Sequence, residues 1–154
     1  MKCRKTCFLQ VPEQKKLKEL EDVVMTYTVM IVDDNPDDIE IMRRALTRSG
    51  VALTIKEAFH GETALKMLKQ CSSAPFLILL DLKMPGMNGI DTLRRIRADA
   101  SLKHIPIIMV TNSLLEADKN DAYAAGANGF LHKAFNFDQF SQDITTALKH
   151  WLKS

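Results

Sequence analysis

The sequence predicts an α/β fold, in which a doubly wound, five-stranded parallel sheet is covered by five helices and preceded by a short N-terminal extension. Two observations lead to this prediction. Short runs typical of strands alternate five times with stretches in which apolar residues recur at helical spacing. One run, residues 76–80, is apolar throughout, as expected of a strand buried on both faces. Strict alternation implies parallel strands, because each helix has to carry the chain back across the sheet.

The expected strands are short and rich in β-branched or apolar residues. They cover residues 28–32, 53–56, 76–80, 105–111 and 130–132. A stretch with one apolar helical face follows each strand, and the helices are expected over residues 36–49, 62–70, 90–97, 114–125 and 138–153. The last helix, for example, places Phe140, Ile144 and Leu148 on one side.

The fourth helix carries a specific start signal. Ser113 and Glu116 have the spacing of a capping box, in which the serine hydroxyl and the glutamate each satisfy a free backbone N–H group. Ser113 is therefore expected to be the N-cap of this helix, and Gly126 is expected to end it.

Composition and charge exclude several classes of protein. The chain is 46% hydrophobic and 26% charged, which is typical of a globular domain and not of a disordered chain. Its longest apolar runs, 76–80 and 107–110, fall far short of the roughly 20 residues that cross a bilayer, so no membrane span is expected. The three cysteines form no CxxC pair, which argues against a zinc site or a disulfide scaffold and favours the cytoplasm.

Residues 1–24 are expected to form an extension to a single domain over residues 25–154. The extension holds six Lys and Arg and four Asp and Glu residues, a balance that accounts for the whole net charge of +2. The domain itself has no basic surplus, so nucleic acid is not an expected partner. Leu17, Leu20 and Val24 have helical spacing, and two interpretations stay open: a solvated, disordered extension, or a short amphipathic helix that supports a partner or a dimer.

Charged and hydroxyl side chains follow four of the five expected strands. Ligands of open parallel sheets bind beyond the carboxyl ends of the strands, so these positions are the candidate site. The residues concerned are Asp33, Asp34, Asp81, Thr111 and Lys133. The remaining strand offers Glu57, which is the weakest candidate.

Three neighbouring carboxylates repel one another, and they either retain a proton or hold a cation. Oxygen ligands without histidine or thiolate favour a hard ion, of which Mg²⁺ is the common one. A carboxylate beside Mg²⁺, with Lys133 and Thr111 opposite, is suited to attack phosphorus and to stabilise phosphoryl oxygens. Taken singly, each residue also has an ordinary role in a turn, a helix start or a strand end; their joint position at one edge favours a site.

Four sequence blocks resemble the receiver domain of two-component response regulators. They are IVDDNPDD (31–38), LLDLKMPGMNG (79–89), IMVTNS (108–113) and AGANGFLHKAF (125–135), in the order and spacing of that family. The resemblance extends from the first strand to the last helix. It implies a flavodoxin-like sheet with the strand order 2-1-3-4-5.

The resemblance also implies a role for each site residue. Asp81 corresponds to the phosphoacceptor, which takes a phosphoryl group from a phosphohistidine of a sensor histidine kinase. Asp34, Asp81 and the backbone carbonyl of Lys83 correspond to direct Mg²⁺ ligands, and Asp33 to a ligand that acts through water. The phosphoryl-binding switch residues are Thr111 and Lys133, joined by Phe130 as the aromatic switch residue.

One position departs from the family pattern. The family usually has proline after the lysine, often with a cis Lys–Pro bond, whereas this chain has Ala134. A cis bond before alanine costs about 3 kcal/mol more than a trans bond. Either a strained cis bond is kept here, or a different trans loop places Lys133.

A narrower resemblance is to the stand-alone receivers associated with bacterial phytochromes. It rests on the DNPDD opening, on Lys133, Ala134 and Asn136, and on Trp151 and Leu152 at the end of the last helix. Such receivers often dimerise through the face formed by the fourth helix, the fifth strand and the fifth helix. A homodimer through this face is therefore expected.

The expected function is that of a single-domain response regulator that accepts a phosphoryl group on Asp81 in a Mg²⁺-dependent reaction and then changes its protein contacts. Such a receiver phosphorylates and dephosphorylates itself and is not a turnover enzyme. The alternatives are a relay to a phosphotransfer histidine and a phosphorylation-independent binding module. A phosphatase of the haloacid dehalogenase type is disfavoured, because its general acid would stand two residues after Asp81, where this chain has Lys83. No effector domain fits beside the receiver in 154 residues, so output through protein contacts is expected.

Overall fold

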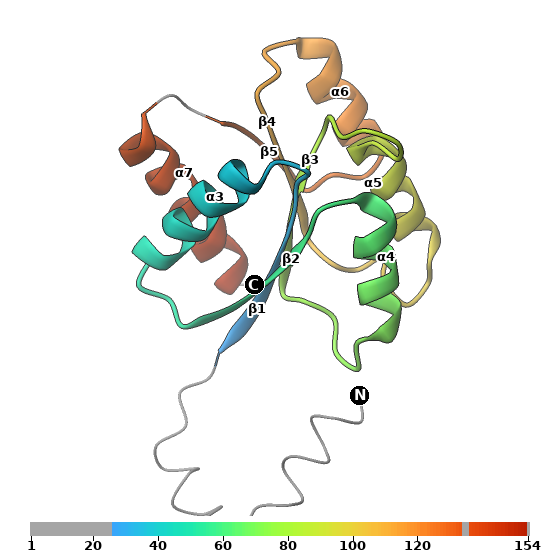
Figure 1. Ribbon diagram of the computed structural model, residues 1–154, viewed down its shortest axis with the longest axis horizontal. Coiled ribbons are helices and arrows are strands. Elements are labelled where there is room, and N and C mark those ends of the chain that lie inside the picture. The colour runs from blue at the N-terminus through green and yellow to red at the C-terminus, as the bar shows by residue number, and fades with distance from the viewer. Residues whose placement is uncertain (1–25, 134–135, 154) are drawn as a thin grey trace, which may run out of the picture.

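A computed structural model describes residues 26–133 and 136–153 (Figure 1). Within them, five parallel strands form one sheet with the order β2-β1-β3-β4-β5, which confirms the predicted fold and strand order. The strands are β1 (Tyr27–Val32), β2 (Leu53–Ala58), β3 (Leu77–Asp81), β4 (Ile107–Thr111) and β5 (Gly129–His132). At most of the strand ends, the observed boundary differs from the predicted one by one or two residues.

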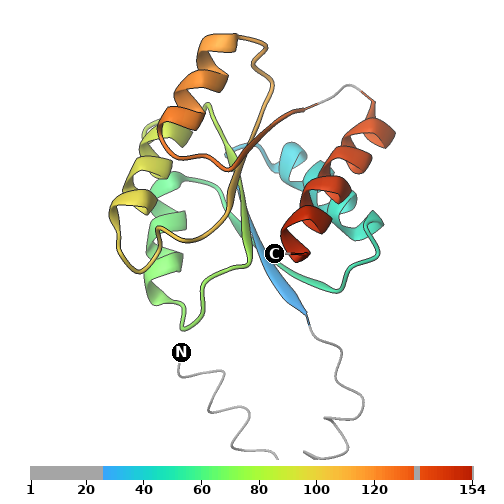
Figure 2. The same cartoon turned by 180° about the vertical axis from the view of Figure 1, so that it is seen from behind.

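The helices of the described chain cover both faces of the sheet. On one face lie α3 (Pro36–Arg48) and α7 (Phe137–Leu152). The opposite face carries α4 (Gly61–Gln70), α5 (Gly89–Ala98) and α6 (Glu116–Ala124), as Figures 1 and 2 show from opposite sides. Among the described residues, no helix is long and apolar enough to cross a membrane.

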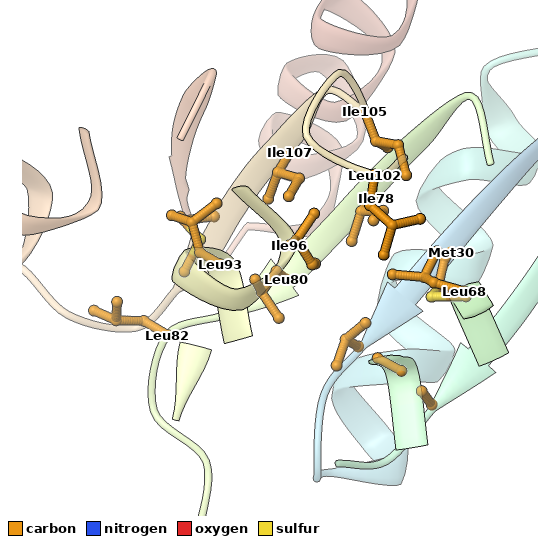
Figure 3. Close-up of a cluster of buried hydrophobic side chains, with 14 of the residues drawn as sticks. Met30, Leu68, Ile78, Leu80, Leu82, Leu93, Ile96, Leu102, Ile105 and Ile107 are labelled. Carbon is orange, nitrogen blue, oxygen red and sulfur yellow. The ribbon is translucent and has the colours of Figure 1, made fainter. Parts of the chain in front are cut away.

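The sheet separates two apolar cores, because successive side chains of a strand point to opposite faces. Met30, Ile78 and Ile107 belong to the core under α4 and α5, where they meet Leu68 and Leu93 (Figure 3). The core under α3 and α7 takes the alternate strand residues, among them Val29, Leu77 and Ile108, together with Met42 of α3 and Phe140 of α7. The central strands β3 and β4 are buried along their whole length, as their apolar sequences predict.

Side chains at the N-termini fix where three of the helices begin. Asn35 caps α3 by accepting a hydrogen bond from the backbone N–H of Asp37, and Pro36 occupies the first helical position. Asn88 caps α5 and Asn136 caps α7 in the same way. These caps place the helix starts beside the carboxyl ends of the strands.

The predicted capping box of the fourth helix is wrong. The helix begins at Glu116, and Leu115, not Ser113, occupies the N-cap position. The Ser113 hydroxyl accepts a hydrogen bond from the N–H of Leu115 and donates one to the carboxylate of Asp118. Because its backbone N–H is also bound to the Thr111 hydroxyl, Ser113 belongs to the turn after β4 and lies outside the helix.

Two expectations from the sequence lie outside the described residues. One is the character of the extension over residues 1–24, and the other is the isomer of the bond between Lys133 and Ala134. Both stay predictions.

Arg97 of α5 ties together the loops that lead into β4 and β5. Its guanidinium donates hydrogen bonds to the backbone carbonyls of Gly126, Lys103 and Ile105 at 2.9, 3.0 and 2.9 Å. A fourth bond of 2.7 Å reaches the side chain of Asn128, which in turn accepts one from the N–H of Ile107. The planar guanidinium therefore fixes the chain entering the strand that precedes Lys133.

Arg97→Lys is expected to lower the free energy of unfolding by about 1–3 kcal/mol, because a lysine cannot satisfy several fixed acceptors at once. Arg94→Lys on the exposed side of the same helix is the matched control, and is expected to stay within about 0.5 kcal/mol of the parent. Urea unfolding of both variants measures the difference. Equal free energies of unfolding for Arg97→Lys and the parent would show that the Arg97 hydrogen bonds contribute little.

Candidate functional site

The five residues singled out at the strand ends line one cavity of about 410 Å³. The register of the strands explains why these residues lie at the same edge of the sheet. Val32 of β1 lies beside Leu80 of β3, so the acids that follow these two residues are neighbours. The other lining residues are Asn35, Asp38, Lys83, Asn112 and Ser113. Glu57, the weakest candidate, is paired with Arg43 and is not among the lining residues.

Asp81 is the last residue of β3, and only 6% of its surface is exposed. The loop that follows it turns back closely, and the N–H of Gly89 donates a 2.9 Å hydrogen bond to the carbonyl of Leu82. A Cβ atom on Gly89 would lie 2.1 Å from the backbone oxygen of Asp81. Glycine is therefore required at position 89 for the backbone of Asp81 to take this place.

Asp33 lies immediately after β1 and is completely buried. One of its carboxylate oxygens accepts a 2.9 Å hydrogen bond from the N–H of Asn35, and the other accepts a 2.7 Å bond from Lys133. Both oxygens therefore have partners within the protein. Asp34, one residue further, is only partly buried and lines the same cavity.

Lys133 directly follows β5, and its ammonium group meets three carboxylates. Its Nζ atom lies 2.7 Å from Asp33, 2.8 Å from Asp38 and 3.4 Å from Asp81. Only 12% of the lysine side chain is exposed, so water screens these ion pairs weakly. The lysine thus holds three carboxylates of the acidic cluster together.

Burial and mutual charge shift the ionisation of this cluster. Burial raises the pKa of Asp81 to about 6, and the negative charge of Asp33 adds to the rise while Lys133 opposes it. Burial also raises the pKa of Asp33, against the hydrogen bonds from Lys133 and Asn35. For Lys133, burial lowers the pKa, but the hydrogen bonds to Asp33 and Asp38 outweigh it and the pKa is raised. The lysine is therefore charged at neutral pH.

Three of these carboxylates are placed to hold a metal ion. One oxygen from each of Asp33, Asp34 and Asp81 lies within 4.8 Å of the others. The set contains only oxygen donors, which suits a hard divalent cation such as Mg²⁺. Burial and repulsion between carboxylates raise the pKa of Asp81, and a bound cation would offset both effects by stabilising the ionised carboxylate.

Thr111, the last residue of β4, lies in the cavity and is tied to its neighbours. Its hydroxyl accepts a 3.0 Å hydrogen bond from the N–H of Ser113, and its backbone carbonyl accepts a 2.7 Å bond from the N–H of Lys133. Ser113 donates to Asp118 of α6, whose carboxylate also lies 3.6 Å from the Lys83 ammonium. A continuous set of contacts therefore joins the Thr111 hydroxyl to the start of α6.

Phe130 lies apart from the acidic cavity. It is a partly buried residue of the edge strand β5 and packs against the core under α4 and α5. On its outer side it lines a groove of about 410 Å³ together with Tyr123 of α6 and Trp151 of α7. Phe130 thus lies between the core under α4 and α5 and the outer groove.

Asp38 is a member of the cluster that the sequence did not predict as a site residue. An acid in the first turn of α3 is favoured by the helix dipole alone, so the position of Asp38 does not by itself indicate a site. Only the structure shows that its carboxylate faces Lys133.

Comparisons with known proteins agree with this fold. The family model of the response regulator receiver domain matches residues 29–145. The chemotaxis protein CheY of Pseudomonas aeruginosa is 40% identical over 116 residues, which are 75% of this chain and 91% of the relative.

Two crystal structures of response regulators resemble the whole described domain. The phosphorylated cyanobacterial phytochrome response regulator RcpA has a TM-score of 0.76 and 31% identity, covering 83% of this chain and 95% of the other. The Mn²⁺-bound response regulator Rcp1 has a TM-score of 0.73 and 27% identity, covering 83% and 96%. These neighbours confirm the resemblance to stand-alone receivers of the phytochrome-associated type. Receiver domains act as phosphoryl-accepting signalling switches and not as turnover enzymes. By its sequence and its fold, this chain belongs to the response regulator receiver domain family.

Proposed function

We propose that this receiver accepts a phosphoryl group on Asp81 from a phosphohistidine of a sensor histidine kinase, in a Mg²⁺-dependent reaction. The observation that carries this proposal is the position of the Asp81 carboxylate, which lies 3.4 Å from the Lys133 ammonium and beside the carboxylates of Asp33 and Asp34. A nucleophile that is close both to a cation and to metal-binding oxygens is suited to phosphoryl transfer.

The residues that would hold Mg²⁺ are Asp34 and Asp81, the backbone carbonyl of Lys83, and Asp33 through a water molecule. All four line the same cavity. Support comes from the oxygen-only donor set and from the structural neighbour Rcp1, which was crystallised with Mn²⁺ bound. When bound, the ion neutralises charge on the transferring phosphoryl oxygens.

The side chains of this chain then have distinct tasks. A carboxylate oxygen of Asp81 attacks phosphorus while the bond from phosphorus to the histidine nitrogen breaks, which yields an acyl phosphate and a neutral imidazole. The Lys133 ammonium pairs with one phosphoryl oxygen. The Thr111 hydroxyl donates to another, after turning from its present contact with the N–H of Ser113. This rotation changes the contacts that link Thr111 to α6.

The output surface is the face formed by α6, β5 and α7, which contains the groove beside Phe130. Phosphorylation adds about two negative charges beside Lys133. The movement of Thr111 toward them releases the backbone N–H of Ser113, and Phe130 is expected to move inward. The groove between α6 and α7 would change shape as a result.

A homodimer across this face is expected once Asp81 is phosphorylated. Light scattering at about 100 µM, far above a micromolar dissociation constant, would detect it with and without a small phosphodonor. Trp151→Ala removes a groove residue and is expected to weaken the dimer, whereas Tyr27→Ala at the distant start of β1 is expected to leave it unchanged. A monomer under both conditions would contradict the dimer and leave the phosphoryl chemistry intact.

The phosphoryl-acceptor proposal is tested by intact mass after incubation with acetyl phosphate and Mg²⁺. The parent protein is expected to gain one phosphoryl group, and both removal of Mg²⁺ by a chelator and the substitution Asp81→Asn are expected to abolish the gain. Asp91→Asn in the exposed first turn of α5 is the matched control and is expected to be labelled like the parent. Full labelling of Asp81→Asn would refute the assignment.

A further inference from the structure

Asp38 forms an ion pair with Lys133 that none of the proposed roles requires. Its Oδ2 atom lies 2.8 Å from the lysine Nζ, within ordinary hydrogen-bond distance. The residue lies in the first turn of α3, whereas the acceptors Asp33 and Asp81 follow β1 and end β3. The contact therefore draws the ammonium group toward the helix side of the cavity.

The geometry around Lys133 is uneven. An ammonium group has three N–H donors, and three carboxylates take them up. The distances to Asp33 and Asp38 are 2.7 and 2.8 Å, whereas the distance to Asp81 is 3.4 Å, longer than a good charge-assisted hydrogen bond. Lys133 is thus bound most weakly to the carboxylate that would receive the phosphoryl group.

The two close partners differ in what their loss would cost. Asp33 is fully buried, and a buried carboxylate that loses its counter-ion is strongly destabilised. The Asp38 side chain is 22% exposed, so water can replace the lysine there. When Lys133 turns toward Asp81, the bond that gives way is therefore the one to Asp38.

We propose that Asp38 is a positioning residue, which holds the Lys133 ammonium away from Asp81 and so restrains phosphoryl acceptance. This inference rests on the proposed function. Before Lys133 can pair fully with a phosphoryl oxygen, its hydrogen bond to Asp38 has to lengthen or break. The charge of Asp38, in the same cavity, adds a repulsion that an incoming phosphodonor has to overcome.

The variant Asp38→Asn tests this inference, because it keeps the size of the side chain and removes the charge that binds Lys133. Its crystal structure without phosphodonor is expected to show Lys133 Nζ closer to Asp81 than in the parent crystal structure, at about 2.9 Å. With acetyl phosphate and Mg²⁺, its rate constant for labelling, followed by intact mass, is expected to rise about threefold or more.

Asp37→Asn is the matched control. It removes the same charge from the same helical turn, but the Asp37 side chain is exposed and forms no hydrogen bond or ion pair with the described residues. Its labelling rate is expected to stay within about twofold of the parent. The comparison separates the position of Lys133 from a general effect of charge.

Three results would overturn the inference. The first is an unchanged distance from Lys133 to Asp81 in Asp38→Asn. The second is a labelling rate of Asp38→Asn no higher than that of Asp37→Asn. A rate below that of the parent is the third, because it would mean that Asp38 holds Lys133 in its productive place. A parent protein that takes no label would refute the proposed function and the restraint with it, whereas a labelled parent with an unaccelerated Asp38→Asn refutes the restraint alone.

Discussion

Asp34→Ala is expected to weaken Mg²⁺ binding by more than about 100-fold, and Asp33→Ala by about tenfold. Both substitutions remove one carboxylate from the cluster, so the change in charge is the same. The oxygens of Asp33 are already bound by Asn35 and Lys133, which leaves this residue to act through water. The Asp34 carboxylate has no hydrogen bond or ion pair within the described chain and lines the open cavity, so it is free to touch the ion.

Calorimetric titration of Mg²⁺ into both variants measures the difference directly. Asp91→Ala, which removes an exposed acid from the first turn of α5 outside this cavity, is the control and is expected to bind Mg²⁺ nearly as the parent does. Equal losses in the Asp33 and Asp34 variants would contradict the distinction between a direct ligand and a water-mediated one.

Asp81→Asn is expected to stabilise the metal-free protein at pH 7 by up to about 3 kcal/mol. Burial and the charge of Asp33 raise the pKa of Asp81 to about 6, so its ionised form is unfavourable in the fold. Asparagine keeps the shape and has no charge. The gain reflects the cost of keeping several carboxylates in one buried cavity.

The sign of the pH dependence follows from this raised pKa. The unfolded chain releases the Asp81 proton near pH 4, whereas the folded protein keeps it until about pH 6. Between these values the folded state binds more protons, so its stability falls as the pH rises. Asp33, whose pKa is also raised, adds to the fall.

Urea unfolding in the presence of a chelator, at several pH values from 4 to 7, is the measurement that checks this prediction. The parent is expected to lose stability across this range, and Asp81→Asn is expected to lose markedly less. Added Mg²⁺ is expected to reverse the order at pH 7, because only the parent retains the full ligand set. Parallel curves for the two proteins would show that Asp81 is not destabilised by ionisation.

The sequence predicted the fold and the edge of the sheet at which the site lies, because both depend on local patterns. Apolar runs and helical spacing determine the alternation of strands and helices, and the carboxyl ends of parallel strands meet at one edge. Asp33, Asp81 and Lys133 therefore lie together as expected. These positions depend on the topology of the backbone, so an error of one or two residues in a predicted strand or helix boundary does not change the predicted site.

The misses concern side-chain contacts that the local spacing of residues does not determine. Ser113 has the spacing of a helix cap, yet its hydroxyl and N–H group bind Asp118 and Thr111, which moves the helix start to Glu116. Asp38 fits the general preference for acids at a helix start, and nothing in its local sequence shows that Lys133, 95 residues away, turns toward it. Competition among several possible partners is decided by the packed structure.

The central claim is that the phosphoryl group is carried by Asp81, and trapping the modified residue tests it most directly. An aspartyl phosphate is an acyl phosphate, which borohydride reduces so that the aspartate becomes homoserine. After treatment with acetyl phosphate and Mg²⁺, and then with borohydride, peptide sequencing by mass spectrometry is expected to find homoserine at position 81. Homoserine at position 33, 34 or 38 in its place, or a labelled protein with unmodified Asp81, would contradict the account.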